Sequence, residues 1–424
     1  MSKFIDWLDE WESVELSSVA DVIDPHPSHR APEEYQLGIP FAGIGDLDEN
    51  GNLKNNGVRK VKADIFEEHI KRYKITSNTI GFGRVASIGK IIDFKGFSNK
   101  VTISPTIAVV EPKNIEKKFL VNTLKSKATK QQIDLLLTGS TRSSLGIALL
   151  RELILPLPPF PEQQKIAKIL TSVDEVIEKT QAQIDKLKDL KTGMMQELLT
   201  NGIGHTEFKD SPVSRIPAQW EVVTFSSVLK KIDSGWSPSC TEIPPSTGKW
   251  GVLKVSAVTR GEFLEIKSKK LPATLEPRHH IQVRKGDILL TRANGVADLV
   301  GKCVMVREEP KRKLMMSDKI LRLNPNEDID AEFLLHSFNS QQTRKQIELS
   351  WGGSSGQKNI SQADIKLYKL ALPPIEEQKK ISQSISQVEH ALKAKDKKLC
   401  SLLGVKKALM QDLLTGKVRV KVDS

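Results

Sequence analysis

The sequence predicts an α+β protein with two homologous mixed α/β domains, separated by two long repeated helices that pack as an antiparallel coiled coil. Residues 158–200 and 373–415 align without a gap, 215 positions apart. Within both copies the apolar residues recur at alternating steps of three and four, which is the spacing of a coiled-coil seam. The regions that precede the copies share shorter matches with each other. Since an internal repeat decides the architecture before any local motif does, we expect one unit written twice.

Each copy predicts one helix of roughly 40 residues, or about 60 Å at 1.5 Å per residue. Proline precedes both helices, and Gly202 and Gly416 follow them as C-terminal caps. Thr180 and Lys395 are polar seam positions, which can help to set the register. The apolar seam comprises Ile166, Leu170, Val173, Ile177, Ile184, Leu187, Leu190, Met194 and Leu198 in the first copy, and Ile381, Ile385, Val388, Leu392, Leu399, Leu402, Val405, Leu409 and Leu413 in the second.

An apolar stripe of this length needs a partner, and the two repeats are the simplest pair. The first helix delivers the chain to the second domain, and the second helix starts there, so the pair is expected to be antiparallel. Two alternatives stay open: each helix packs onto its own domain as core, or it pairs with another copy of the chain. The predicted boundaries are 1–157 for the first domain, 158–202 for the first helical spacer, 203–372 for the second domain and 373–424 for the second spacer.

Matched motifs make the two domains homologous. Trp11-Glu12 matches Trp220-Glu221, and the strand that ends at Arg84 matches the strand that ends at Arg292. Short β-rich runs alternate with turn residues and short helical segments, so each domain is predicted to mix α and β structure. The domains diverge far more than the helices. This difference predicts two related surfaces that recognise different things.

Composition narrows the class of protein. The net charge of +12 favours a polyanionic partner, although a lysine-rich surface also keeps a protein soluble. The three cysteines are far apart, so neither a disulfide frame nor a zinc site is indicated. No apolar stretch is long enough to span a membrane, and the N-terminus lacks the pattern of a signal peptide. We therefore expect a cytoplasmic protein without a membrane partner.

Motifs that suggest an enzyme do not hold. Residues 41–45 are similar to the glycine-rich loop with which DNA methyltransferases bind S-adenosylmethionine, but the matched residues 252–256 contain no glycine and are typical of a strand. Residues 46–51 begin like a calcium loop, but Gly57 stands where that loop needs a bidentate glutamate. The histidines are scattered, and no set of nucleophile, base and orienting group is present. The sequence does not indicate catalysis.

Basic residues at matched, turn-like positions of the two domains are the positive signal. Arginine, lysine and glutamine are residue types that hold phosphates or recognise base edges. A single one of them is more often a solvated charge, so their recurrence carries the prediction. The candidate DNA-binding residues are Arg84, Lys90 and Arg142 in the first domain and Arg292, Lys302, Gln357 and Lys358 in the second.

Two motifs at the start of the helices identify a family. Leu155-Pro156-Leu157-Pro158-Pro159-x-x-Glu162-Gln163 recurs as Leu370-Ala371-Leu372-Pro373-Pro374-x-x-Glu377-Gln378, with Ala371 in place of the first proline. With the Leu-Leu-Thr ends of the helices, this pattern resembles the specificity (S) subunit of type I restriction-modification systems. The resemblance spans essentially the whole chain, although the first domain lacks a leading segment like residues 207–220.

The resemblance implies a function. Each globular domain would be a target recognition domain for one half of a bipartite, asymmetric site on double-stranded DNA, with the coiled coil setting the spacing. The implied partners are two methyltransferase (M) subunits, which bind S-adenosylmethionine, and restriction (R) subunits, which use ATP and Mg. The chain itself would hold no cofactor and catalyse nothing. The predicted methyltransferase-docking residues are Pro158, Pro159, Glu162, Gln163, Pro373, Pro374, Glu377 and Gln378.

Two other functions stay open at this point. The chain could be a non-enzymatic scaffold whose coiled coil recruits proteins and whose basic charge is incidental. It could also be an orphan or phase-variable specificity subunit that serves methylation only.

Overall fold

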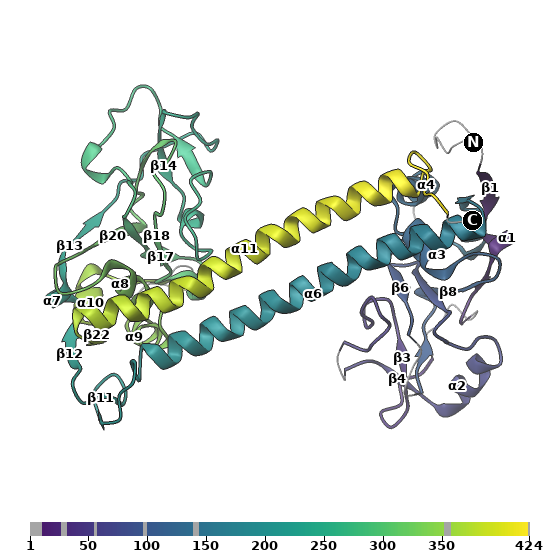
Figure 1. Cartoon of the computed structure of the whole chain (residues 1–424), viewed down its shortest axis with the longest axis horizontal. Coiled ribbons are helices and arrows are strands. Elements are labelled where there is room, and N and C mark those ends of the chain that lie inside the picture. Colours follow the sequence, from purple (N-terminus) through teal and green to yellow (C-terminus); the bar gives the residue numbers. More distant parts are fainter. Residues whose placement is uncertain are drawn as a thin grey trace. The chain divides into compact units, whose positions relative to one another are not determined.

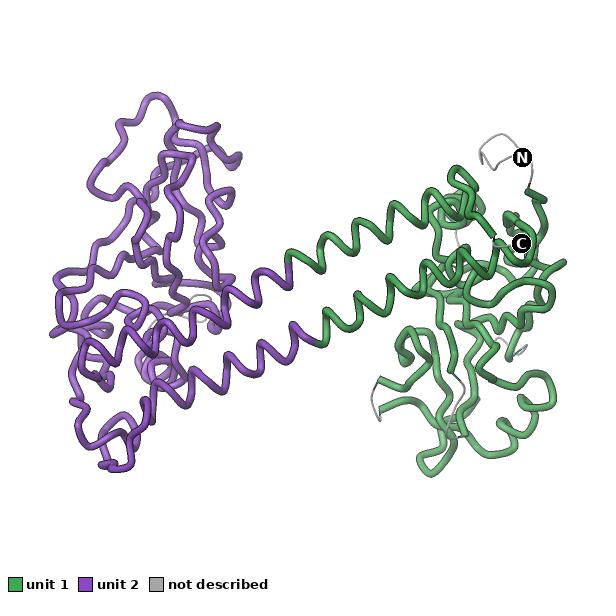
Figure 2. The backbone as a smooth tube through the Cα atoms, in the orientation of Figure 1, with its two compact units in different colours: residues 1–182, 397–424 green, residues 183–396 purple. Residues whose placement is uncertain are grey.

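The computed structural model describes residues 11–26, 32–54, 57–95, 100–138, 144–351 and 358–422. They form two compact units (Figure 2): unit 1 comprises residues 1–182 and 397–424, and unit 2 comprises residues 183–396. Two helices, α6 (Phe160–Leu198) and α11 (Ile375–Leu413), each contribute one half to each unit (Figure 1). Each unit therefore consists of a globular domain with two helix halves.

Unit 1 contains a four-stranded sheet in the order β2-β8-β5-β6, with all neighbours antiparallel, and a three-stranded sheet in the order β4-β3-β7. Strands β3 and β7 of the second sheet are parallel, and β1 pairs with β9. The elements are β1 (Glu12–Glu15), α1 (Leu16–Val19), β2 (Ala20–Ile23), β3 (Ile39–Ala42), β4 (Lys60–Val61), α2 (Ala63–Ile70), β5 (Ile80–Gly83), β6 (Ile91–Asp93), β7 (Thr102–Ile103), β8 (Ile107–Pro112), α3 (Lys117–Leu124), α4 (Lys127–Leu137), α5 (Ile147–Arg151) and β9 (Ile154–Leu157).

Unit 2 repeats this topology with sheets in the orders β13-β20-β16-β18 and β15-β14-β19, and with the pair β12-β22. Its β14 and β19 are parallel, as are β3 and β7 in unit 1. The elements are β10 (Phe208–Lys209), β11 (Ile216–Pro217), β12 (Glu221–Thr224), α7 (Phe225–Val228), β13 (Leu229–Ser234), β14 (Trp250–Leu253), η1 (Val255–Ala257), β15 (Ser268–Lys270), η2 (His279–Ile281), β16 (Ile288–Thr291), β17 (Ala293–Asn294), η3 (Ala297–Leu299), β18 (Cys303–Met305), β19 (Lys313–Met315), β20 (Ile320–Pro325), α8 (Ala331–Phe338), α9 (Gln341–Ser350), β21 (Lys358–Asn359), α10 (Gln362–Leu367) and β22 (Lys369–Leu372).

The predicted fold class and the predicted homology of the domains are confirmed. The residues predicted to form a strand at 252–256 fall in β14 and the turn after it, and β14 pairs with β19 as β3 pairs with β7. Four-stranded and three-stranded sheets in one domain bury two apolar clusters per unit, one on each sheet. The larger cluster of each unit also receives the helices, for example Ile166 and Leu170 of α6 in unit 1.

The helix halves pair in an antiparallel sense within each unit. In unit 1, Lys406 of α11 forms an ion pair with Asp174 of α6. In unit 2, Lys191 of α6 lies 2.8 Å from Glu389 of α11, and Lys395 donates to Gln183 at 2.8 Å. Since residue numbers fall along α6 as they rise along α11, the antiparallel prediction is confirmed. The alternative of packing onto its own domain holds as well for the first turns of each helix, and the last turns pack onto the other domain, as Leu413 does in unit 1 and Leu198 in unit 2.

The seam differs from the prediction in the last third of each helix. Leu190 and Val405, which are 215 positions apart, are each 50% exposed. A two-helix pair covers a seam residue from one side only, so side chains at its margin stay in contact with solvent. Thr180 is buried and donates to the carbonyl of Val176 at 2.7 Å, which satisfies its hydroxyl within the helix.

Candidate nucleic-acid interface

The strand that carries the first predicted arginine ends in the same backbone turn in both units. In unit 1, Gly83 N–H donates to the carbonyl of Lys90, and Gly89 N–H donates to the carbonyl of Gly83. In unit 2, Thr291 and Lys302, and Gly301 and Thr291, make the same two bonds. Gly89 and Gly301 have φ angles of 79° and 81°, a left-handed conformation that glycine adopts without strain. The matching of Arg84 with Arg292 and of Lys90 with Lys302 is thus a property of the fold.

In unit 1 the two matched basic side chains are bound inside the domain. Arg84 Nε donates to the carbonyl of Leu145 at 3.0 Å, and its Nη1 lies 3.3 Å from the carboxylate of Asp24. Lys90 Nζ donates to the carbonyls of Ile44 and Leu47, both at 2.8 Å. Burial, with a smaller contribution from nearby Lys54, lowers the pKa of Lys90. Lys90 thus holds the loop after β3, Arg84 is bound to Leu145 and Asp24, and neither is presented as a free charge.

In unit 2 the matched side chains are not bound in this way. Lys302 is exposed and Arg292 is half-buried, and neither forms a side-chain hydrogen bond or ion pair with another residue in the described part of the chain. The cause lies at the ends of β2 and β13, which are separated from β5 and β16 by one strand of the same sheet. Asp24 follows Ile23, which pairs with Val109, and the residue at the same register position in unit 2 is Ser234. Arg292 therefore has no carboxylate where Arg84 has one.

A short strand pair places further predicted residues beside Arg292. Ala293 pairs with Asn359 and Asn294 with Lys358, and Ile360 N–H donates to the carbonyl of Arg292 at 3.1 Å. Lys358, half-buried in β21, therefore lies next to the end of β16. Arg142 and Gln357 lie outside the described residues. Of the predicted set, unit 2 thus gathers Arg292 and Lys358 at one strand end, and that they contact DNA stays a prediction.

The glutamines of the two family motifs have a structural role that the sequence did not indicate. Gln163 accepts from Glu116 N–H at 2.9 Å and donates to the carbonyl of Pro158 at 2.8 Å. Gln378 does the same with Asp330 N–H and the carbonyl of Pro373, each at 2.8 Å. Both side chains are about 2% exposed or less. Since Glu116 and Asp330 are the N-caps of α3 and α8, each glutamine fixes a long helix to the helix that follows the central sheet.

The glutamates of the motifs bind the segment that follows the other long helix. Glu162 accepts from Arg419 through both carboxylate oxygens, at 2.8 Å each. Glu377 accepts from Ile203 N–H at 3.0 Å, His205 Nε2 at 2.8 Å and Trp220 Nε1 at 3.0 Å. A lone arginine in the C-terminal tail carries no sequence signal for this role. Aligning the two helix ends by the offset of 215 places Arg419 opposite Gly204 and not opposite His205, so the shared role is visible only in the structure.

These contacts bear on the predicted docking residues. Glu162, Gln163 and Gln378 are buried, and Glu377 is largely engaged within unit 2. Pro158 and Pro373 are buried, whereas Pro159 and Pro374 are exposed. The motif thus stabilises each unit, and its exposed part is small.

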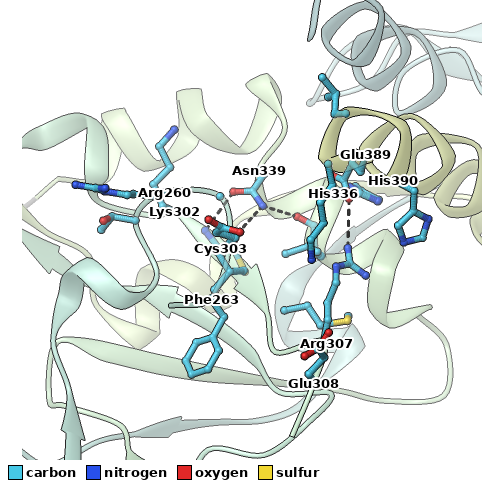
Figure 3. Close-up of a pocket in the computed structure, with 18 of the residues that line it drawn as sticks. Arg260, Phe263, Lys302, Cys303, Arg307, Glu308, His336, Asn339, Glu389 and His390 are labelled. Atoms are coloured by element: carbon cyan, nitrogen blue, oxygen red, sulfur yellow. Dashed lines mark hydrogen bonds and ion pairs between the residues drawn. The ribbon is translucent and has the colours of Figure 1, made fainter. Parts of the chain in front are cut away.

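A cleft of about 1150 Å³ opens in unit 2 between the domain and the two helices (Figure 3). Arg260 and Lys302 lie toward one side of it, and His336, Glu389 and His390 toward the other. Some of its charges are paired: Arg307 lies 2.5 Å from Glu332 and 3.2 Å from Glu389.

Two side chains of the cleft, Cys303 and His336, are affected by burial. Burial raises the pKa of the Cys303 thiol, so the thiolate needed for nucleophilic attack is disfavoured. Burial also lowers the pKa of His336, whose Nε2 has no hydrogen-bond partner among the described residues. Asn339 bonds both backbone groups of Cys303 and fixes β18 to α8. These groups support the domain and do not form a set of nucleophile and base.

A duplicated domain with one backbone and divergent polar residues, mounted on a helix pair, defines a class of two-domain recognition proteins. The family described as the type I restriction modification DNA specificity domain matches residues 8–189 and 217–399, and the chain belongs to this family. It is a type I specificity subunit with two such domains.

Relatives and solved structures agree with this assignment. The chain is 29% identical over 422 residues to the specificity subunit of the type I restriction enzyme MjaX of Methanocaldococcus jannaschii, covering 97% of this chain and 95% of that protein. It is 37% identical over 190 residues to the EcoEI specificity subunit of Escherichia coli, covering 44% of this chain and 31% of that protein. The crystal structure of the type I S subunit from M. genitalium shares the fold, with a TM-score of 0.59 and 16% identity over 98% of this chain and 97% of that one. No helix in the described ranges is long and apolar enough to cross a membrane.

Proposed function

We propose that each globular domain recognises one half of a bipartite, asymmetric DNA site, and that the helix pair sets the spacing between the halves. The observation that carries the proposal is that one backbone turn recurs in both units, with its basic side chains bound inside unit 1 and unpaired in unit 2. Divergent side chains on one scaffold suit two different half-sites. Phosphate contacts would supply most of the affinity, and base contacts the specificity.

We also propose that the helices bind two identical methyltransferase subunits. Leu190 and Val405 support this, because an equally exposed apolar residue at matched positions of two helices offers the same contact twice. S-adenosylmethionine would then be held by the methyltransferase subunits, and ATP and Mg by restriction subunits. The chain would work in the cytoplasm as the non-catalytic recognition subunit.

The test is methylome sequencing of a host that expresses the chain with its methyltransferase subunit. One heptad is inserted into α6 after Thr180 and one into α11 after Lys395, which keeps the seam register and lengthens each helix by about 10 Å. We expect a spacer longer by up to about three base pairs at 3.4 Å each, with both half-sites unchanged.

A heptad in α6 alone is the matched control and should abolish methylation, because it shifts the two helices relative to each other. An altered half-site in the double insertion would contradict the proposal. A wild-type complex that binds DNA without salt dependence would favour a protein-recruiting scaffold instead.

A further inference from the structure

One exposed arginine of unit 2 is held by an aromatic ring instead of a carboxylate. The guanidinium of Arg278 lies 4.0 Å from the centroid of the Trp236 ring. Trp236 is half-buried and packs on the apolar cluster of the three-stranded sheet, so the ring has a supported position. The backbone of Arg278 is anchored too, since its N–H donates to Met315 Sδ at 3.1 Å. A stacked guanidinium loses less side-chain entropy when it binds, because part of the ordering is already present.

The donors of this guanidinium are not used by the described residues. Arg307, Arg312 and Arg322 of the same unit are all ion-paired with carboxylates. Arg278 forms no side-chain hydrogen bond or ion pair with another described residue, and it is exposed. The N–H groups of its guanidinium are therefore available to a ligand with two adjacent acceptors.

The Arg278–Trp236 stack is connected to the strand end that carries Arg292. Trp236 N–H donates to the carbonyl of Met316 at 2.9 Å, and the next residue, Ser237, donates to Asp318 at 2.5 Å. One residue further along, the carbonyl of Lys319 accepts from Arg292 N–H at 2.9 Å. The turn at 316–319 thus joins the stack to the basic residues for which a DNA contact is proposed.

The described residues of unit 1 contain no counterpart of the stack at the matched position. The register that matches Asp24 with Ser234 matches His26 with Trp236. His26 is buried, and its Nδ1 lies 2.8 Å from His69 Nε2. Burial, with a smaller contribution from the nearby His26, lowers the pKa of His69. Among the described residues, the stack is therefore found only in the domain of unit 2, which is proposed to bind one of the two half-sites.

We propose that Arg278 recognises a guanine in the half-site bound by unit 2, with its N–H fork on the O6 and N7 acceptors, and that Trp236 is the positioning residue. Guanine is the base whose major-groove edge presents two adjacent acceptors, and a bidentate arginine is its commonest partner. The inference rests on the proposed function, because it names a specificity-determining residue of that function.

The test uses the complete chain in complex with its methyltransferase subunit, on duplexes that carry the site found by methylome sequencing. Each guanine of the unit 2 half-site is replaced in turn by 7-deazaguanine, which lacks the N7 acceptor. For the wild-type complex we expect one such replacement to weaken binding by about five- to hundredfold. Arg278→Ala should lose affinity for the unmodified duplex to a similar extent and should no longer distinguish it from that replacement.

Three variants make the test specific. Arg278→Lys keeps the charge but not the planar fork and should behave as Arg278→Ala. Trp236→Phe keeps a ring and should retain most of the discrimination. Arg215→Ala removes a guanidinium that lies 5.4 Å from the centroid of the Phe208 ring, far along the chain from the proposed interface, and should change nothing. Melting temperatures of all variants separate a loss of fold from a loss of recognition.

The outcomes are distinct. Equal weakening on all sequences would make Arg278 a phosphate contact and overturn the proposal, as would an Arg278→Ala complex that keeps the wild-type preference. A wild-type complex with no sequence preference at all would overturn the proposed function together with this inference.

Discussion

The turns at the ends of β5 in unit 1 and β16 in unit 2 have the same backbone bonds and opposite side-chain arrangements. Lys90 donates to two carbonyls inside its domain, whereas Lys302 at the same position is exposed at the rim of a cleft. Arg84 is paired with Asp24, whereas Ser234 stands at the matched position in unit 2. Homologous positions in a duplicated protein therefore need not keep the same role. A residue at the end of another strand of the same sheet decides whether a basic side chain stabilises the domain or remains available to a ligand.

The first turns of the two long helices, in contrast, make equivalent contacts in both units. Gln163 and Gln378 make equivalent hydrogen bonds in the two units. Glu162 and Glu377 also bind equivalent segments, although the donors are Arg419 in unit 1 and His205 in unit 2. Here a change of residue preserves the contact, because a carboxylate accepts equally well from either side chain. The first turns of the long helices thus need the same contacts in both units, whereas the surfaces proposed to bind DNA do not.

The largest expected effect concerns this common part. Gln163→Leu and Gln378→Leu leave a backbone N–H and a carbonyl without their buried partner, which should lower the free energy of unfolding by about 2–4 kcal/mol. Urea denaturation of each variant measures it. Gln164→Leu, at the exposed neighbouring position, should stay within about 0.5 kcal/mol of wild type. If Gln163→Leu were as stable as this control, the glutamine would not anchor the helix.

The second prediction separates the matched lysines. Lys90→Met should lower the free energy of unfolding by about 1–2 kcal/mol, since two carbonyls lose their donor, and should leave the salt dependence of DNA binding unchanged. Lys302→Met should not change stability but should weaken DNA binding and reduce the slope of log K against log salt by about 1. Urea denaturation and DNA titration at several salt concentrations check both. Equal salt slopes for the two variants would mean that the lysines share one role.

The smallest expected effect comes from exchanging Asp24 and Ser234, the matched residues near Arg84 and Arg292. Ser234→Asp should give Arg292 the carboxylate that Arg84 has and lower DNA affinity by about two- to tenfold, since the guanidinium is neutralised. Asp24→Ser should lower the free energy of unfolding by about 1 kcal/mol or less, because the remaining bond to Leu145 is kept. Ser239→Asp, at an exposed position five residues further along, is the control for added negative charge. An equal loss of DNA affinity in both serine variants would show a general charge effect.

Much of the architecture could be predicted from the sequence, because local periodicity encodes it. The apolar steps placed both helices, and each is 39 residues long. Gly202 and Gly416 were correctly predicted as caps, with φ angles of 67° and 73°. At Gly202 an added Cβ would lie 2.6 Å from Glu377 Oε1, so the glycine also permits the contact of that carboxylate.

The candidate site was less predictable. The matching of Lys90 with Lys302 was correct, but nothing in the order of residues indicated that two carbonyls bind one of them. The roles of Arg419 and Glu162 were missed because the two residues are far apart in the chain and only the antiparallel helices bring them together. The stack of Arg278 on Trp236 was missed because these residues are also far apart in the chain and only the fold of the second domain brings them together.

The sequence by itself determined that this protein has two homologous domains and two long repeated helices, and which positions of the domains correspond. These properties depend on periodicity and similarity, which are local or internal to the chain. Only the tertiary structure decided which of the matched charges are bound inside a domain and which remain available. That outcome depends on residues such as Asp24 or Ser234, which lie on a different strand of the sheet. The local sequence pattern does not specify which distant strands pair or in which register.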